Sequence, residues 1–233
     1  MSRCCSRSQM SMRRLYRKTG TAHAALAEPQ AGPRDVRDRE AAVKIGQYAF
    51  DEFVDKVREF HGSAAPGVIA GGVMVDIARE HLPQGKLYDV VCESAKCLPD
   101  AVQLLTPCTL GNGWLKVCET SRYALAFFDK YTGEGVRVFL DASALGPWPA
   151  LRAWFLKEKA KAEQDQAEIV EEIKKAGRSI YGIEHVRVKR DFLASRTRRH
   201  RPVSLCPSCG EAYMADLGQR CPACMGTGPY ETG

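Results

Sequence analysis

The stretch from Tyr123 to Asp141 reads Tyr-Ala-Leu-Ala-Phe-Phe-Asp-Lys-Tyr-Thr-Gly-Glu-Gly-Val-Arg-Val-Phe-Leu-Asp. Two runs rich in aromatic and aliphatic side chains, 123–129 and 136–141, flank a short turn that contains two glycines. Such runs around a glycine-containing turn are typical of a β-hairpin. Further strands are predicted at 87–93 and 114–119. The sequence therefore predicts a meander of strands in this half of the chain.

Helices are predicted before these strands. Between residues 41 and 60 apolar side chains recur at helical spacing among charged ones, which is typical of an amphipathic helix. Residues 61–67 interrupt this pattern, and 68–82 form a largely apolar stretch whose small residues suit close packing against a sheet. A short helix is predicted at 99–105. Together, these elements predict an α+β fold in which helices pack on one face of a mostly antiparallel sheet.

The segment after the hairpin is rich in Lys, Glu, Ala and Gln. Residues 151–175 are predicted to form one long helix with few large apolar side chains, which acts as an arm and ends at Gly177. Residues 187–201 then hold seven Lys or Arg against the single acid Asp191. This basic run precedes the last segment of the chain.

Four cysteines near the C-terminus have the spacing of a metal site. Cys206 and Cys209 form one C-x-x-C pair, and Cys221 and Cys224 form a second after a short gap. Two such pairs can supply four thiolates to one ion, and zinc in a closed Cys4 shell is structural because no coordination position stays open. A zinc ion contributes on the order of 10–16 kcal/mol to folding in modules of this size. The alternatives are a rubredoxin-type iron site and a redox disulfide pair.

A second group of candidate residues lies in the predicted core, at the ends of successive elements. The candidates for a ligand or substrate site are His61, Cys97, Asp100, Cys108 and Thr109. Glycines at 111 and 113 would let backbone N–H groups approach a ligand closely. The alternative is that the cysteines serve packing, because free cysteine is among the most buried residue types.

Several of these residues also carry a resemblance to a known family. They are Phe60, His61, Gly62, Pro66, Gly67, Glu93, Cys97, Asp100, Ala101, Cys108, Thr109, Gly111, Gly113, Leu115, Tyr123 and Ala124. In this order and spacing they resemble the FmdE family of formylmethanofuran dehydrogenase proteins over residues 45–142. Members often carry a helical arm and then a ribbon that opens Cys-x-x-Cys-Gly-Glu, as residues 206–211 do here.

The chain departs from the family pattern at positions that the resemblance marks as candidate ligands. The family pattern is similar to His-Gly-His-x-Cys-Pro-Gly, and the second His and the Cys are Ser63 and Ala65 here. A later Lys of the family pattern is Asn112. A core site reduced to His61, Cys97 and Cys108 would still offer three zinc ligands, or would serve packing alone.

These features divide the chain into five expected segments. They are a disordered basic tail (1–40), an FmdE-like α+β core (41–149), a helical arm (150–178), a basic connector (179–203) and a Cys4 zinc ribbon (204–228). The whole chain has 233 residues, a formal net charge of +6 and ten cysteines. No run of 18 apolar residues is present, so the sequence predicts no membrane span and a cytoplasmic protein with reduced thiols.

The resemblance implies a zinc-binding accessory protein: a non-catalytic partner, or a metal-handling or maturation factor, of a molybdenum or tungsten pterin enzyme. It leaves open whether the chain is part of an enzyme complex without a redox centre of its own. One alternative is a zinc-ribbon regulatory protein that binds nucleic acid through its basic run. The other is a thiol- or metal-dependent enzyme that uses the core Cys, His and Asp residues. The expected partners are a second copy of the chain, joined through crossing arms, and subunits of the molybdenum or tungsten enzyme.

Overall fold

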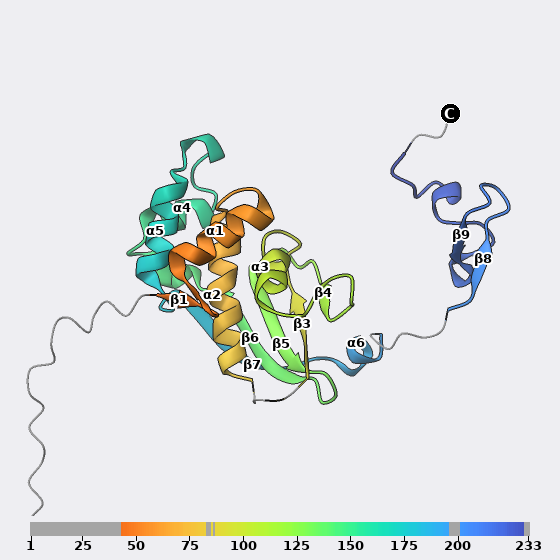
Figure 1. The fold of residues 1–233 in the computed structure, drawn as a ribbon, viewed down its shortest axis with the longest axis horizontal. Coiled ribbons are helices and arrows are strands. Elements are labelled where there is room, and N and C mark those ends of the chain that lie inside the picture. The colour runs from red at the N-terminus through yellow and green to blue at the C-terminus, as the bar shows by residue number, and fades with distance from the viewer. Residues whose placement is uncertain (1–42, 83–84, 86, 196–200, 231–233) are drawn as a thin grey trace, which may run out of the picture. The chain divides into compact units, whose positions relative to one another are not determined.

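The computed structural model describes residues 43–82, 85, 87–195 and 201–230 (Figure 1). The predicted basic tail, residues 1–40, lies outside the described residues, and so do residues 196–200 of the basic run. Two described parts follow from this: a mixed α/β core up to residue 195 and a small C-terminal module from residue 201.

The core contains a five-stranded sheet with the strand order β4-β3-β5-β6-β7. Its strands are β3 (Tyr88–Cys92), β4 (Leu115–Val117), β5 (Ala124–Asp129), β6 (Glu134–Leu140) and β7 (Tyr181–Arg187). Only β3 and β4 pair in parallel, and the other three pairings are antiparallel. The prediction of a mostly antiparallel sheet with packed helices is confirmed. The predicted meander is wrong at its start, because β3 lies between β4 and β5.

The hairpin of β5 and β6 occupies the position predicted for it. Its register pairs Ala124 with Phe139 and Phe128 with Gly135. A side chain at residue 135 would collide with the carbonyl oxygen of Phe127, so the register needs glycine there. Since side chains alternate along a strand, Phe127 and its neighbours on one face join the hydrophobic core, and Arg137 lies on the opposite face.

Helix α2 (Pro66–Glu80) is the central helix of the core, and its residues are buried from Pro66 to Val75. It contacts β5 and β6 of the sheet as well as helices on either side. Its glycines permit these close approaches, because a Cβ at Gly72 would collide with the ring of Phe53 in α1 (Phe50–His61). The predicted small-residue helix is thereby confirmed. Figure 1 shows α1, α2, α4 and α5 grouped beside one another.

The predicted helix 41–60 begins later than expected. Residues before α1 form a two-stranded hairpin of β1 (Lys44–Ile45) and β2 (Tyr48–Ala49). Gly46 has φ = 62° in the turn between them. A left-handed glycine conformation reverses the chain, so helical periodicity in the sequence did not become a helix here.

The prediction of one long helix over 151–175 is wrong. The segment forms α4 (Pro149–Phe155), a 3₁₀ turn (Lys161–Glu163) and α5 (Gln166–Ala176). Lys157 adopts φ = 60° directly after α4, a conformation that ends a right-handed helix. Asp165 then begins α5, because its carboxylate accepts hydrogen bonds from two backbone N–H groups.

Helix α5 belongs to the core and is no arm. Ile169 and Ile173, one turn apart, are fully buried in the main hydrophobic cluster together with Leu151 of α4. Ile169 and Ile173 are two of the few large apolar side chains of this segment on which crossing arms would depend. The prediction of a homodimer therefore loses that basis.

Strand β7 completes the sheet from within the predicted basic connector. It pairs with β6 over seven residues, from Leu140 with Tyr181 to Glu134 with Arg187. The hydroxyl of Tyr181 donates a hydrogen bond to the carbonyl of Ala70 in α2, at 3.2 Å. The connector prediction is thus wrong for residues 181–187. A short helix, α6 (Arg190–Ser195), follows.

The C-terminal module is small and held by few regular elements. A two-stranded hairpin of β8 (Val203–Leu205) and β9 (Ala212–Met214) precedes two 3₁₀ turns, at Ala215–Leu217 and Ala223–Met225. This agrees with the predicted small ribbon. Among the described residues, no helix combines the length and apolar character that crossing a membrane requires.

Candidate metal centre and candidate ligand cavity

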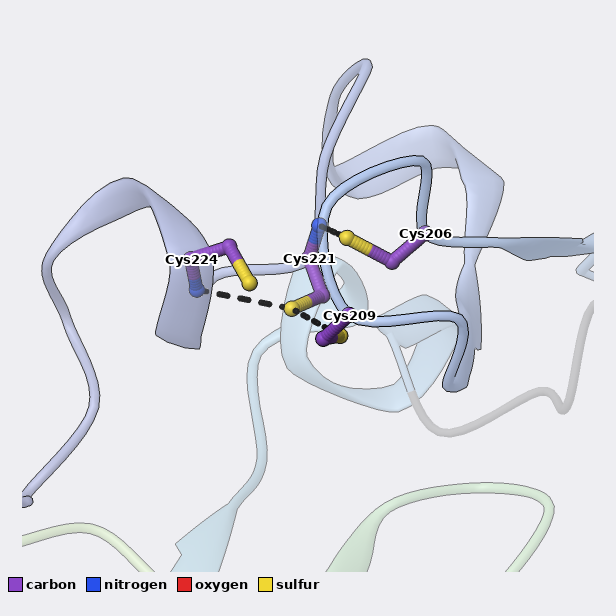
Figure 2. Close-up of side chains that lie close together, drawn as sticks. All are labelled: Cys206, Cys209, Cys221 and Cys224. Carbon is purple, nitrogen blue, oxygen red and sulfur yellow. Dashed lines mark hydrogen bonds between the residues drawn. The ribbon is translucent and has the colours of Figure 1, made fainter. Parts of the chain in front are cut away.

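The four predicted cysteine ligands come together in the C-terminal module (Figure 2). Their sulfur atoms all lie within 4.8 Å of one another. Cys209 Sγ and Cys221 Sγ are 3.8 Å apart. Four sulfurs bound tetrahedrally at the usual zinc–sulfur distance are separated by about 3.8 Å. The sulfur positions therefore fit one tetrahedral metal ion.

Backbone geometry holds each thiol in place. Cys206 directly follows β8, and its N–H donates to the carbonyl of Glu211 at 2.8 Å. Gly210, with φ = 77°, turns the chain so that its N–H reaches the carbonyl of Cys206. The second pair lies at the 3₁₀ turn that contains Cys224. Two tight turns thus present two thiols each.

The electrostatics of the four thiols favour a bound cation. Backbone N–H groups of Cys221 and Cys209 lower the pKa of the Cys206 thiol to about 6. Hydrogen bonds that the Cys224 thiol donates to the sulfurs of Cys221 and Cys209 raise its pKa to about 12. Four crowded sulfurs cannot all ionise beside one another unless a positive charge lies between them. A divalent metal ion removes that conflict, because thiolates are its ligands.

In the core, His61 and Asp100 form a close pair. Nδ1 of His61 lies 2.6 Å from Oδ2 of Asp100, and the two side chains are 29% and 30% exposed. His61 ends α1, and Asp100 lies in the first turn of α3 (Leu98–Leu105). The pair therefore connects two helices of the core.

Cys108 and Thr109 have structural environments. Cys108 is buried, its Sγ lies 3.9 Å from the carbonyl oxygen of Tyr88, and burial raises its pKa. The Thr109 hydroxyl accepts a hydrogen bond from the N–H of Asn112, while Asn112 Oδ1 accepts one from the N–H of Thr109. These bonds hold the turn before β4. In the described part of the chain, the metal-ligating groups of three or more comprise the C-terminal cysteines alone.

Cys97 differs from the other core candidates because it lines a cavity. It precedes α3 with a positive φ of 63° and ψ of −49°, and it is half-buried. Burial, with the nearby charge of Asp100, raises the pKa of its thiol. Gly67 in α2 leaves room for it, since a Cβ at residue 67 would lie 2.7 Å from the Cys97 sulfur.

The cavity has a volume of about 890 Å³, within the range of small-molecule sites. We call it the basic cavity. Its lining includes five cationic side chains and three aromatic ones: Lys96, Arg122, Lys157, Lys159, Lys161, Tyr123, Trp154 and Phe155. Ser63, at a position that the family pattern marks, also lines it, whereas His61, Asp100, Cys108 and Thr109 do not.

Sequence reasoning placed Cys97 and Ser63 near a site but missed the lysines and the aromatic residues. The alternation of lysine at 157, 159 and 161 was the available signal. A helical interpretation of this segment places Lys159 on the side opposite Lys157 and Lys161, so it concealed their common direction.

A network of ion pairs surrounds Arg137, on the sheet face opposite the hydrophobic core. Glu93 is only 8% exposed, and its carboxylate contacts Arg137 at 2.5 Å and Arg122 at 2.7 Å. Arg137 also contacts Glu184 of β7 at 2.9 Å. Burial alone would raise the pKa of Glu93, but the hydrogen bonds and charge of Arg137 outweigh it and hold the pKa below its usual value.

The basic run that suggested nucleic-acid binding is partly neutralised in the described residues. Arg187 pairs with Glu134 across the β6–β7 ladder. Arg201 forms a two-pronged contact with Asp216, with both N–O distances at 2.7 Å. At least these two cations are engaged within the protein.

Comparisons with known proteins agree with this architecture. Residues 60–188 match the family model described as "FmdE, Molybdenum formylmethanofuran dehydrogenase operon". Residues 197–231 match a model described as the FmdE treble clef zinc finger, which specifies the type of the predicted ribbon.

A solved structure is similar to most of the chain. The crystal structure of a tungsten formylmethanofuran dehydrogenase FmdE-like protein from Syntrophus aciditrophicus is 48% identical, with a TM-score of 0.75. The similarity covers 82% of this chain and 99% of that one.

A probable S-adenosyl-L-methionine-binding protein from Archaeoglobus fulgidus is 28% identical over 176 residues. That match covers 69% of this chain and 48% of the relative, so the chain spans about half the length of the curated protein. With the FmdE model matched over most of the core and a second FmdE model over the cysteine module, the chain belongs to the FmdE family.

Proposed function

We propose that this protein is an accessory protein of a molybdenum or tungsten pterin enzyme system, where it acts as a non-catalytic partner or as a metal-handling or maturation factor. The observation that carries the proposal is family membership, since the matched family is described by the molybdenum formylmethanofuran dehydrogenase operon. The 48% identical structure is described as a tungsten formylmethanofuran dehydrogenase FmdE-like protein, which supports the same system.

The metal of the C-terminal module is proposed to be Zn²⁺. Cys206, Cys209, Cys221 and Cys224 would hold it, and the match to a zinc-finger model supports this choice. A tetrahedral shell of four thiolates has no position for substrate, so zinc here supplies folding energy. The module would then present a fixed surface to a partner.

The state of the core thiols favours a non-catalytic role over a thiol enzyme. Burial raises the pKa of Cys92 to about 12 and also raises the pKa values of Cys97 and Cys108. Thiols in this state are protonated at neutral pH and are poor nucleophiles. Nδ1 of His61 is engaged by Asp100, and its side chain does not line the basic cavity where Cys97 lies.

S-adenosylmethionine, named for the Archaeoglobus relative, finds less support as a ligand of this chain. It carries a positively charged sulfonium group, and such a group would face five cationic side chains, with no carboxylate among the described residues that line the basic cavity. The short cover of that relative also limits the transfer of its function.

Purification of the untagged protein from its host tests the proposal. We expect subunits of a molybdenum or tungsten pterin enzyme to copurify, as identified by mass spectrometry, and one zinc per chain by elemental analysis. A strain that produces a Cys206→Ser/Cys209→Ser variant is the matched control, because it tests whether copurification requires an intact C-terminal module. Copurification of nucleic acid instead of enzyme subunits would favour the regulatory alternative. Unchanged pterin-enzyme activity in a deletion strain, with none of its subunits recovered, would overturn the proposal.

A further inference from the structure

We propose that the basic cavity binds a phosphorylated heteroaromatic small molecule, with the phosphate among the lysines of residues 156–165 and the ring beside Trp154 and Phe155. The inference rests on the cavity alone and does not depend on the proposed enzyme system. It specifies the chemistry of a ligand: at least two negative charges joined to one planar ring.

The charge distribution of the lining is the first argument. Five Lys or Arg side chains line the cavity, and among the described residues no Asp or Glu does. Among the described residues, Lys96, Lys159 and Lys161 form no ion pair, whereas Lys174, outside the cavity lining, pairs with Asp51. Lysine is a common phosphate ligand because its ammonium acts as a compact charge with three donors.

The nearby carboxylates are turned to other partners. In the segment between α4 and α5, Glu158 pairs with Arg152, Glu163 accepts from the backbone N–H of Ala160, and Asp165 caps α5. The three lysines of the same segment all line the cavity. In this segment the lysine side chains therefore line the cavity, while the carboxylates form an ion pair or hydrogen bonds with neighbouring residues.

Acidic residues from the neighbouring loops follow the same rule. Glu119 accepts hydrogen bonds from the backbone N–H groups of Ala95 and Ser121. Glu93 is held by Arg137 and by Arg122, so Arg122 is a cation of the lining that already has a carboxylate partner, and the lysines carry the argument. Neither Glu119 nor Glu93 lines the cavity. An anionic ligand would thus meet ammonium groups without an opposing carboxylate from these loops.

Backbone strain is a second and independent argument. Among the described residues, the non-glycine residues with positive φ are Cys97 (63°), Ser121 (59°) and Lys157 (60°). All three line the basic cavity, although they come from three different loops. Such conformations cost on the order of 1–3 kcal/mol each and cluster at ligand sites. Their convergence here indicates that the shape of the cavity is maintained at a cost to stability.

The aromatic side chains argue for a planar ring. Tyr123, Trp154 and Phe155 form a mutual cluster with ring centroids 6.0–6.3 Å apart. The Tyr123 hydroxyl is bonded to the carbonyl of Gly67, which fixes that ring. Trp154 and Phe155 are only partly buried, so part of their apolar surface remains available to a ligand. Aromatic surface beside lysines suits a molecule with a ring at one end and phosphate at the other.

Calorimetric titration of the full-length, metal-loaded chain tests this inference with two matched pairs of probes. The pairs are flavin mononucleotide with riboflavin and adenosine 5′-diphosphate with adenosine. We expect at least one phosphorylated probe to bind ten-fold or more tightly than its unphosphorylated partner. Equal or undetectable binding of both members of both pairs would overturn the proposal.

Variants then localise the binding. The triple variant Lys157→Gln/Lys159→Gln/Lys161→Gln is expected to weaken the phosphorylated probe by at least ten-fold. The control variant Lys44→Gln/Lys116→Gln/Lys175→Gln removes the same charge outside the cavity lining and should change binding less than two-fold. Equal weakening by the two triple variants would show attraction to net charge only and would contradict a site. All substituted lysines of the cavity are exposed, so the fold should tolerate the change.

The role of the ring is tested separately. Trp154→Leu should weaken the phosphorylated probe by about five-fold or more while leaving the weak binding of inorganic phosphate unchanged. Inorganic phosphate that binds as tightly as the organic phosphates would overturn the aromatic part of the proposal. Thermal unfolding of each variant confirms that the chain is folded at the titration temperature.

Discussion

The four-cysteine module and the basic cavity differ in how their residues are brought together. The module takes its ligands from two short turns within residues 206–224, and their spacing was visible in the sequence. The cavity takes its lining from loops before α2, α3 and β5, from the end of α4 and from the segment between α4 and α5. A site with local ligands is specified by the spacing of its residues, whereas a site assembled from distant loops is specified by the fold.

The two regions also differ in what stabilises them. In the module Val203 and Leu205 are 60% and 71% exposed, and the buried side chains are chiefly those of Cys206 and Cys221. In the core, Phe53 and Phe127 are fully buried among many apolar neighbours. Apolar burial is the main favourable contribution to core stability, while a module with so little of it needs another source of stability, which the proposed zinc ion would supply.

Metal removal should have the largest effect and should affect one region only. Chelation, or the substitution Cys206→Ser, is expected to abolish the folded structure of residues 203–227, because the four thiols lose the ion that joins them. Two-dimensional NMR spectra should lose the dispersed signals of the module and retain those of the core. Cys118→Ser, outside the cluster, is the control. Loss of core signals on chelation would contradict the independence of the two regions.

A substitution in the hairpin of β5 and β6 is expected to destabilise the core and to leave the cysteine module intact. Gly135→Ala places a Cβ against the Phe127 carbonyl and the Phe128 side chain, and should lower the free energy of unfolding of the core by about 3 kcal/mol. Urea unfolding followed by circular dichroism measures the loss. Gly146→Ala is the matched control, since a Cβ there would meet no atom within 4 Å. Metal content should stay the same in both variants, and a changed zinc stoichiometry would argue against separation of the regions.

The buried carboxylate of the core should make its stability depend on pH. The pKa of Glu93 is lowered in the folded state, so its contribution is present above the pKa of the unfolded chain and is lost as pH falls through the lower, folded value. Glu93→Gln should cost about 2 kcal/mol at pH 7, because Arg137 keeps a largely buried charge with Glu184 as its remaining carboxylate partner, and less in acid.

Urea unfolding at pH 7 and pH 3 checks this dependence. Glu59→Gln, in an exposed pair with Lys56, is the control and should change stability by less than about 0.5 kcal/mol. An equal cost of Glu93→Gln at both pH values would show that folding does not lower the pKa of this carboxyl group, and would contradict the prediction.

A smaller effect is expected at the start of α5. Asp165→Ala removes the side chain that caps two backbone N–H groups and should cost about 1 kcal/mol. Because Gln164 and Gln166 line the basic cavity, the same variant should weaken the organic phosphate probe. Asp55→Ala, on the exposed side of α1, should change neither quantity. Binding that is unchanged despite a lost cap would separate α5 from the cavity.

Much of the fold was accessible from local signals. The hairpin at 123–141 combines alternation with a glycine turn, and the cysteines carry their geometry in their spacing. The split of residues 151–175 was not accessible, because lysine, glutamate and alanine all favour a helix. Tertiary packing decided it: burial of Ile169 and Ile173 aligned α5 with the core, and Lys157 took a left-handed conformation that no propensity predicts.

The same reasoning explains the candidate residues. Cys108 and Thr109 were candidates for a ligand or substrate site because glycines lie close to them in the sequence. In the structure, their hydrogen bonds stabilise a turn and a buried strand end. Cys97 was found for its thiol, but its backbone conformation and its place in the cavity became visible only in three dimensions.

The direct pairing of Leu140 with Tyr181 has a consequence for how this family can diversify. The chain leaves β6 and returns to the neighbouring position on β7, so residues 141–180 form an excursion whose two ends are joined by the sheet. Within it, the lysine-bearing segment lies between two anchored helices. Each doubling of such a loop costs only about 0.6 kcal/mol. Evolution can therefore lengthen, shorten or recharge this segment and give the same scaffold a different ligand without altering the sheet on which it stands.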